Sequence, residues 1–177
     1  MLLKGIAMIN YSWHQATGND VESIVKLAQT NFESEIDQYF NPQPITYSRN
    51  ITTAVVNSFF TPNSELLKVA KTPAGKLIAY TWAISTERSA WSDDNIIAIK
   101  MAHVDLTLPA RIRIQLIKDM FMLWELFAVQ SNVSIICSTS IRKEQSAFLK
   151  LHKQFGYDVR GSIAYKKVST TQATPAN

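Results

Sequence analysis

The chain has 177 residues, a net charge of +4 and 46% hydrophobic residues. This length is typical of one domain, and the apolar content excludes an intrinsically disordered chain. No apolar run reaches the roughly 18 residues of a membrane span, since the nearest, 120–129, is interrupted by Glu125. The first residues lack the apolar segment of a secretory signal, so we expect a cytoplasmic protein. The single cysteine, Cys137, excludes an internal disulfide, and we interpret it as a small buried residue.

The positive charge is concentrated near the C-terminus. Residues 141–167 contain seven Lys and Arg against only Glu144 and Asp158. These residues are either the solvated faces of a helix and a strand, or a surface for an acidic partner or nucleic acid. No nucleic-acid recognition motif accompanies them, which favours the first interpretation.

The first part of the chain predicts one strand and two helices. Alternating apolar and polar residues predict a strand over 9–15, and residues 17–20 form a turn that can cap a helix over about 21–31. Two prolines in segment 41–44 interrupt the chain. Apolar residues then recur at helical spacing over 51–59, which predicts a second helix.

A hairpin and a crossover unit follow. Segments 65–71 and 76–85 flank a turn with proline and glycine, which is typical of an antiparallel hairpin. A long strand over 95–108 leads into an apolar helix over 111–130. The next short strand, 133–138, should lie parallel to the strand before the helix.

The chain closes with one more helix and strand. We expect a helix over 144–154, ended by Gly156, and a terminal strand over 157–168. This order predicts an α/β (α+β) fold in which about four helices flank a mixed central sheet. Residues 1–168 form one domain, and residues 169–177 form a flexible polar tail.

This order of elements, with three local segments, resembles the GNAT (Gcn5-related N-acetyltransferase) superfamily over nearly the whole domain. Segment 15–20 resembles the family's first strand and turn, and segment 71–80 resembles its hairpin. Segment 145–157 resembles its "Asn…Ala…Leu-Tyr-x-x-x-Gly-Phe" pattern. The resemblance implies an N-acyltransferase that moves an acyl group from acetyl-CoA, or another acyl-CoA, to an amine substrate.

The resemblance places the cofactor between the fourth and fifth strands and at the start of the helix after the fourth. In the family, amides of this helix hold the pyrophosphate, and glycines let the backbone approach it closely. The matching segment 111–116 has Ile114 and Leu116 where the family has small residues, so the chain looks like a divergent member. The implied cofactor-binding residues are Leu106, Leu108, Arg111, Arg113, Ile114, Gln115, Leu116 and Gln145.

Acyl transfer to an amine needs a base for the amine and an acid for the departing thiolate. The family commonly places a carboxylate on the fourth strand, where this chain offers His103 and Asp105, two residues apart and so on one face. The family's acidic tyrosine corresponds to His152, with Tyr157 and Tyr165 as further candidates. His152 is otherwise a surface residue among lysines, and Asp105 needs either a hydrogen-bonded partner or a functional site.

Two functions stay open. The first is the acyltransferase. The second is a non-catalytic GNAT-fold binding or structural protein, such as a bacteriophage virion component in the host cytoplasm or virion. In that case Ile114 and Leu116 fill the cofactor gap, and the basic C-terminal face contacts a protein assembly or an acidic partner. Neither function involves a membrane, and no metal is expected, because His103 and Asp105 lack a third ligand.

Overall fold

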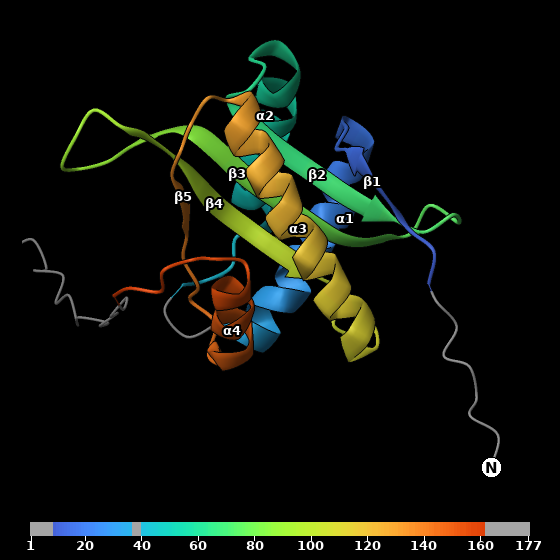
Figure 1. Ribbon diagram of the computed structural model, residues 1–177. Helices are drawn as coiled ribbons and strands as arrows, with labels where there is room; N and C mark the ends of the chain where they lie inside the picture. Colours follow the sequence, from blue (N-terminus) through green and yellow to red (C-terminus); the bar gives the residue numbers. More distant parts are fainter. Residues whose placement is uncertain (1–8, 37–39, 162–177) are drawn as a thin grey trace, which may run out of the picture.

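The structure, a computed structural model, describes residues 9–36 and 40–161. Its centre is a five-stranded mixed sheet in the order β1-β2-β3-β4-β5, with α3 in front and α1 and α2 behind (Figure 1). The strands are β1 (Ser12–Gln15), β2 (Glu65–Lys71), β3 (Leu77–Arg88), β4 (Asn95–Val104) and β5 (Ile136–Ser138). The helices are α1 (Val21–Asn31), α2 (Pro44–Phe60), α3 (Ala110–Gln130) and α4 (Ser146–Gln154). A short 3₁₀-helix, η1 (Gly18–Asp20), precedes α1, and a short π-helix, η2 (Phe32–Ile36), follows it.

The predicted α/β (α+β) fold, with a mixed sheet and four helices, is confirmed. The β2–β3 hairpin forms where expected, and Gly75 adopts a positive φ of 80° in its turn. β4 and β5 pair in parallel, as the crossover predicts. Residues 157–161 form no strand, and the rest of the predicted terminal strand and the tail lie outside the described residues.

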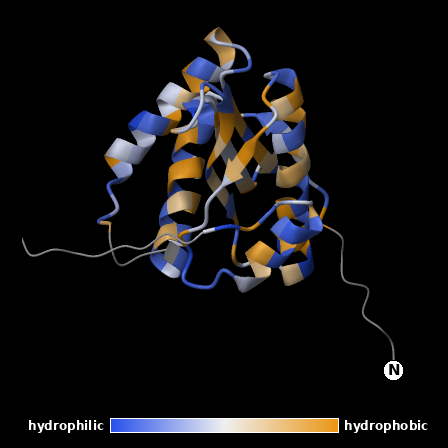
Figure 2. Cartoon of the chain, turned by 60° about the vertical axis from the view of Figure 1, so that its left-hand side comes forward, coloured by the Kyte–Doolittle hydropathy of each residue, from blue (hydrophilic) through white to orange (hydrophobic). Residues whose placement is uncertain are grey.

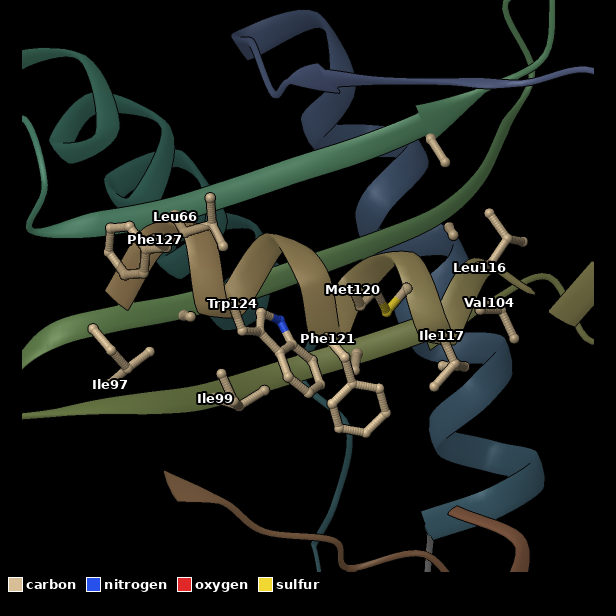
Figure 3. Close-up of a cluster of buried hydrophobic side chains, with 14 of the residues drawn as sticks. Leu66, Ile97, Ile99, Val104, Leu116, Ile117, Met120, Phe121, Trp124 and Phe127 are labelled. Atoms are coloured by element: carbon tan, nitrogen blue, oxygen red, sulfur yellow. The ribbon is translucent and has the colours of Figure 1, made fainter. Parts of the chain in front are cut away.

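The largest core lies between the sheet and α3 (Figure 3). Phe121 and Trp124 are fully buried there, with ring centroids 4.9 Å apart. The indole Nε1 of Trp124 donates to Thr81 Oγ1 at 2.8 Å, and that hydroxyl donates to the Met101 carbonyl at 3.1 Å. This relay satisfies the polar atoms inside an apolar layer and ties α3 to both β3 and β4.

A second core packs α1 and α2 against the opposite face of the sheet. Ile24 of α1 and Ile51 of α2 are fully buried there, beside Val69 and Tyr80 of the sheet. Figure 2 shows the mostly hydrophobic strands enclosed between helices whose outer surfaces are more polar. Burial on both faces fixes the position of β4 from both sides.

β4 changes its alternation in the middle of the strand. Trp82 pairs with Met101, but the next residue, Ala83, pairs with Ile99, so Lys100 is an extra residue in a β-bulge. Because of the bulge, Ile99 faces α3 whereas Met101 faces α1 and α2. After the bulge, Met101 and His103 therefore face the helices behind the sheet, whereas Ala102 and Val104 face α3.

β4 and β5 separate at the same point. They pair only from Ile97 to Ile99 on β4 and from Ile136 to Ser138 on β5, while β4 continues to Val104. β5 is thus an edge strand among the described residues, and Cys137 is exposed. The expectation that Cys137 is buried is wrong, because this face of β5 has no described layer over it.

Candidate functional site

A cavity of about 610 Å³ opens where β4 leaves β5. Its walls come from α1, from segment 40–44 and the first turns of α2, from residues 99–103 of β4, and from segment 138–142. The volume lies within the range of roughly 300–1,000 Å³ that is usual for small-molecule sites. Most of the wall is apolar, so any polar group in it is informative.

His103 is the most informative of these polar groups. It lines the cavity, is only 3% exposed, and its ring stacks on Tyr80 at a centroid distance of 5.4 Å. Its Nδ1 is buried and has no hydrogen-bond partner among the described residues. Burial, with a smaller contribution from the Arg142 charge, lowers the pKa of His103 to about 3, so the imidazole is neutral at physiological pH.

A tyrosine pair supports His103 from behind. The hydroxyls of Tyr47 on α2 and Tyr80 on β3 lie 2.7 Å apart, and Tyr47 also lines the cavity. Burial raises the pKa of both tyrosines, so both hydroxyls remain protonated. This pair ties α2 to the sheet and fixes the ring on which His103 stacks.

Arg142 crosses the gap between the two strands. Its Nε donates to Glu35 Oε2 at 3.0 Å, its Nη2 donates to the Ala102 carbonyl of β4, and its guanidinium lies 4.7 Å from the ring centroid of Phe148. The backbone amide of Lys143 donates to the Glu35 carbonyl at 2.8 Å. The segment after β5 is thereby held to η2, which follows α1.

The backbone of β4 beyond the bulge presents hydrogen-bonding groups to this gap. The amide of Asp105 donates to the Ile78 carbonyl on β3 at 2.8 Å. Because the backbone groups of successive strand residues point to opposite sides, the amides and carbonyls of Val104 and of Ala102 point toward the gap. Their carbonyls confirm this direction, since Arg142 binds that of Ala102 and Asn31 Nδ2 binds that of Val104 at 3.1 Å. The fully buried Asn31 keeps its Oδ1 without a partner among the described residues.

Asp105 has the partner that its apolar surroundings require. Its carboxylate accepts from Lys76 Nζ at 2.7 Å and from the amide and hydroxyl of Thr107 at 3.0 and 2.6 Å. Burial favours a raised pKa, but the hydrogen bonds from Lys76 and Thr107 outweigh it and hold the pKa of Asp105 below its usual value. These contacts end β4 at Val104, four residues before the predicted end, and Asp105 is not part of the cavity wall. The structure thus places His103 in the cavity wall and Asp105 outside it, and a catalytic role for Asp105 stays a prediction.

His152 is buried rather than exposed. It is 4% exposed, its Nδ1 lies 2.9 Å from the Phe148 carbonyl, and its Nε2 lies 2.9 Å from Ser138 Oγ at the end of β5. Burial is the main reason that the pKa of His152 is lowered. The alternative that made His152 a surface residue is therefore wrong, because the ring is held in an aromatic cluster.

That cluster also holds Tyr157. Its ring lies 5.0 Å from His152 and 5.4 Å from Phe121 between centroids. Its hydroxyl is buried without a partner among the described residues, and burial raises its pKa. Both predicted acids thus lie together where α4 packs against Phe121 of α3, and their catalytic roles stay predictions. Tyr165 lies outside the described residues.

The predicted pyrophosphate site at the start of α3 differs from a glycine loop. α3 begins at Ala110, so Ile114 and Leu116 lie within the helix, the first 46% exposed and the second fully buried. Arg111 is exposed, while Arg113 has a buried Nε without a partner among the described residues. Only the first turn of the helix therefore presents amides to an anion.

The remaining predicted cofactor residues have structural contacts. Leu106 and Leu108 are partly buried against the core under α3. Gln115 donates to Asp119 on the next turn at 2.9 Å, and the backbone of Gln145 precedes α4. None of these four lines the cavity. The described residues also contain no group of three or more His, Cys, Asp or Glu placed to hold a metal.

The fold just described is that of the GNAT acetyltransferases. A similar structure is the aminoglycoside 6'-N-acetyltransferase AAC(6')-Ih from Acinetobacter baumannii, with a TM-score of 0.64 and 12% identity over 92% of this chain and 100% of that chain. A predicted acetyltransferase with acetyl-CoA from Clostridium acetobutylicum matches with a TM-score of 0.68 and 12% identity over 89% of this chain and 96% of that chain. Glucosamine-6-phosphate N-acetyltransferase from Arabidopsis thaliana matches with a TM-score of 0.64 and 11% identity over 90% and 99%.

No protein-family model matches the sequence, and no curated protein matches it. At such identities the likeness establishes the fold, whereas function has to be argued from the site. None of the described helices is long and apolar enough to cross a membrane.

Proposed function

We propose that this protein is an N-acyltransferase that moves an acyl group from acyl-CoA to an amine. The observation that carries the proposal is the gap between β4 and β5, which opens onto a cavity lined by the neutral, unpaired imidazole of His103. The three solved structures reported above are acetyltransferases or predicted acetyltransferases, which supports the same reaction class.

The residues beside the gap fit the chemistry of an acyl-CoA. The backbone of Ala102 and Val104 points into the gap and can pair with a pantetheine arm, itself a chain of amides, once the side chains of Arg142 and Asn31 release the two carbonyls that they now bind. The first turn of α3, with Arg111 and Arg113 beside it, offers donors for a pyrophosphate. When bound, the cofactor supplies an acyl group activated as a thioester.

The residues of the cavity then have distinct tasks. His103 Nδ1 accepts a hydrogen bond from the incoming amine and orients its lone pair, while the apolar walls exclude water. In the transfer, the carbon–sulfur bond breaks and a carbon–nitrogen bond forms. The amine loses one proton and the CoA thiolate gains one. The proton that leaves the amine is the one that the thiolate gains, and we propose His152 and Tyr157 as relays that pass it on, each reaching the gap only through a rearrangement of its present contacts.

Acetyl-CoA binding to Arg142→Ala tests the proposal. The substitution frees the Ala102 carbonyl without any need to displace the guanidinium, so we expect acetyl-CoA to bind several-fold more tightly by calorimetry. Arg160→Ala is the matched control, because Arg160 is exposed and pairs with Asp158 away from the cavity. Mass spectrometry of a mixture of protein, acetyl-CoA and a primary amine should show the acetylated amine. Failure of both wild type and Arg142→Ala to bind acetyl-CoA would contradict the proposal.

A second candidate function, a non-catalytic binding protein, has a specific observation in its favour. Arg142 and Asn31 already hold the two carbonyls that face the gap, and Ile114 and Leu116 replace the small residues expected at the phosphate site. This function predicts no acetyl-CoA binding in either wild type or Arg142→Ala, so the same calorimetric experiment separates the two candidates.

A further inference from the structure

The charges around the cavity restrict which amine can enter it. No aspartate or glutamate is found among the described residues of its wall. The two charged side chains of the wall are Lys100 and Arg142, and each pairs with a glutamate that is not part of the wall, Glu87 at 2.6 Å and Glu35 at 3.0 Å. The described residues of the wall therefore offer no negative charge to a bound cation.

The uncharged part of the wall exposes mostly apolar and aromatic surface, and its polar side chains are neutral amides and hydroxyls, those of Gln29, Asn41, Gln43, Thr46, Asn50 and residues 138–140. Val25 and Ala28 of α1, Phe32 of η2, Tyr47 of α2 and Met101 of β4 contribute to it. The buried polar atom that remains without a partner, His103 Nδ1, can accept one hydrogen bond. This arrangement suits a ligand with one amine group and an apolar body.

We propose that the acceptor is a primary amine whose remaining part is apolar or aromatic and carries no second positive charge. This inference rests on the proposed function and specifies its substrate class. The reacting amine enters as the neutral free base, since His103 Nδ1 accepts its hydrogen bond and no described wall residue carries a negative charge. A second amine, which is an ammonium group at neutral pH, would leave water without a counter-charge among the described residues of the wall, and an unpaired charge in an apolar environment is strongly unfavourable. Polyamines and other polycationic amines are therefore poor ligands of this cavity.

A matched pair of amines tests the inference directly. Hexylamine and 1,6-diaminohexane have the same carbon chain and differ by one terminal ammonium group. Binding is followed by NMR titration of the wild-type chain labelled at its histidine rings, with the His103 signals as the reporter. We expect hexylamine to bind at least tenfold more tightly and to shift the His103 signals.

An introduced carboxylate provides the converse test. Asn50→Asp adds a negative charge to the wall with little change of shape and should reduce the preference for hexylamine by several-fold. Thr52→Asp adds the same charge to α2 outside the wall and should leave the preference unchanged. Equal or tighter binding of the diamine by the wild type, or no shift of His103 with either amine, would overturn the inference.

Calorimetry with acetyl-CoA keeps this inference separate from the proposed function. If acetyl-CoA binds but the diamine is preferred, only the substrate class is wrong. If hexylamine binds selectively but acetyl-CoA does not bind, the cavity is an amine site and the acyltransferase proposal is wrong.

Discussion

Replacing His103 by leucine should flatten the pH dependence of stability on the acidic side of neutrality. The imidazole is 3% exposed, and its pKa falls from 6.5 to about 3 on folding, chiefly through burial. Between these two values the unfolded chain binds a proton that the folded chain does not bind. Stability of the wild type therefore decreases as the pH falls below 6.5.

The size of this effect follows from the two pKa values. One pKa unit corresponds to about 1.4 kcal/mol, so lowering the pH from about 7.5 to about 5 should remove about 2 kcal/mol of unfolding free energy through His103 alone. The lowered pKa of His152 adds to the total loss in the same direction. The difference between wild type and His103→Leu isolates the contribution of His103.

Urea denaturation followed by tryptophan fluorescence at both pH values measures this difference. The leucine variant should lose about 2 kcal/mol less than the wild type on acidification. His14→Gln is the control, because it removes an exposed histidine of β1 and leaves His103 in place. A leucine variant that loses as much stability as the wild type would refute the reasoning that His103 is buried and neutral.

Three further predictions concern the frame of the site. Trp124→Ala should lower the unfolding free energy by about 3–5 kcal/mol in urea denaturation, because it leaves a cavity and removes the bond to Thr81; a loss below about 1 kcal/mol would contradict this packing. Gly75→Ala should cost about 1–2 kcal/mol through its positive φ, whereas Gly18→Ala should not, and equal effects would contradict the turn. Asp105→Asn should remove the stability that is lost in the wild type as the pH falls through the lowered pKa of Asp105; unchanged acid denaturation would show that the Lys76 pair is unimportant.

Local sequence signals were sufficient for most of the fold. The β2–β3 hairpin combines two alternating segments with a turn whose glycine needs a positive φ, and all of that information lies within 24 consecutive residues. α3 has a strong apolar pattern and starts within one residue of its predicted start. The errors arose where long-range contacts decide the boundary. β4 ends early because Lys76, from the neighbouring hairpin, helps Asp105 to form the turn.

The candidate site was only partly accessible to sequence reasoning. His103 stood out as a polar residue in an apolar strand, but nothing local indicated that Arg142 would meet Glu35 across more than 100 residues of chain. His152 was ambiguous because a histidine on an amphipathic helix is stable on the surface, or in the core if both ring nitrogens have partners. The structure supplies both partners, the Phe148 carbonyl and Ser138 Oγ.

The hydrogen bond from Arg142 to the Ala102 carbonyl of β4 either gives way to a ligand or blocks the gap permanently, and its energetics favour the first alternative. The Arg142 and Glu35 side chains are 16% and 28% exposed, and partly buried ion pairs contribute little net stability because desolvation offsets their attraction. A ligand with several hydrogen-bonding groups could therefore displace Arg142 from the Ala102 carbonyl at small cost, provided that Glu35 keeps the guanidinium nearby. If Arg142 instead closed the gap permanently, its contacts would have to stabilise the fold strongly. Arg142→Ala should accordingly change the unfolding free energy by no more than about 1 kcal/mol while tightening acetyl-CoA binding, and a loss of 3 kcal/mol or more by urea denaturation would indicate a structural plug.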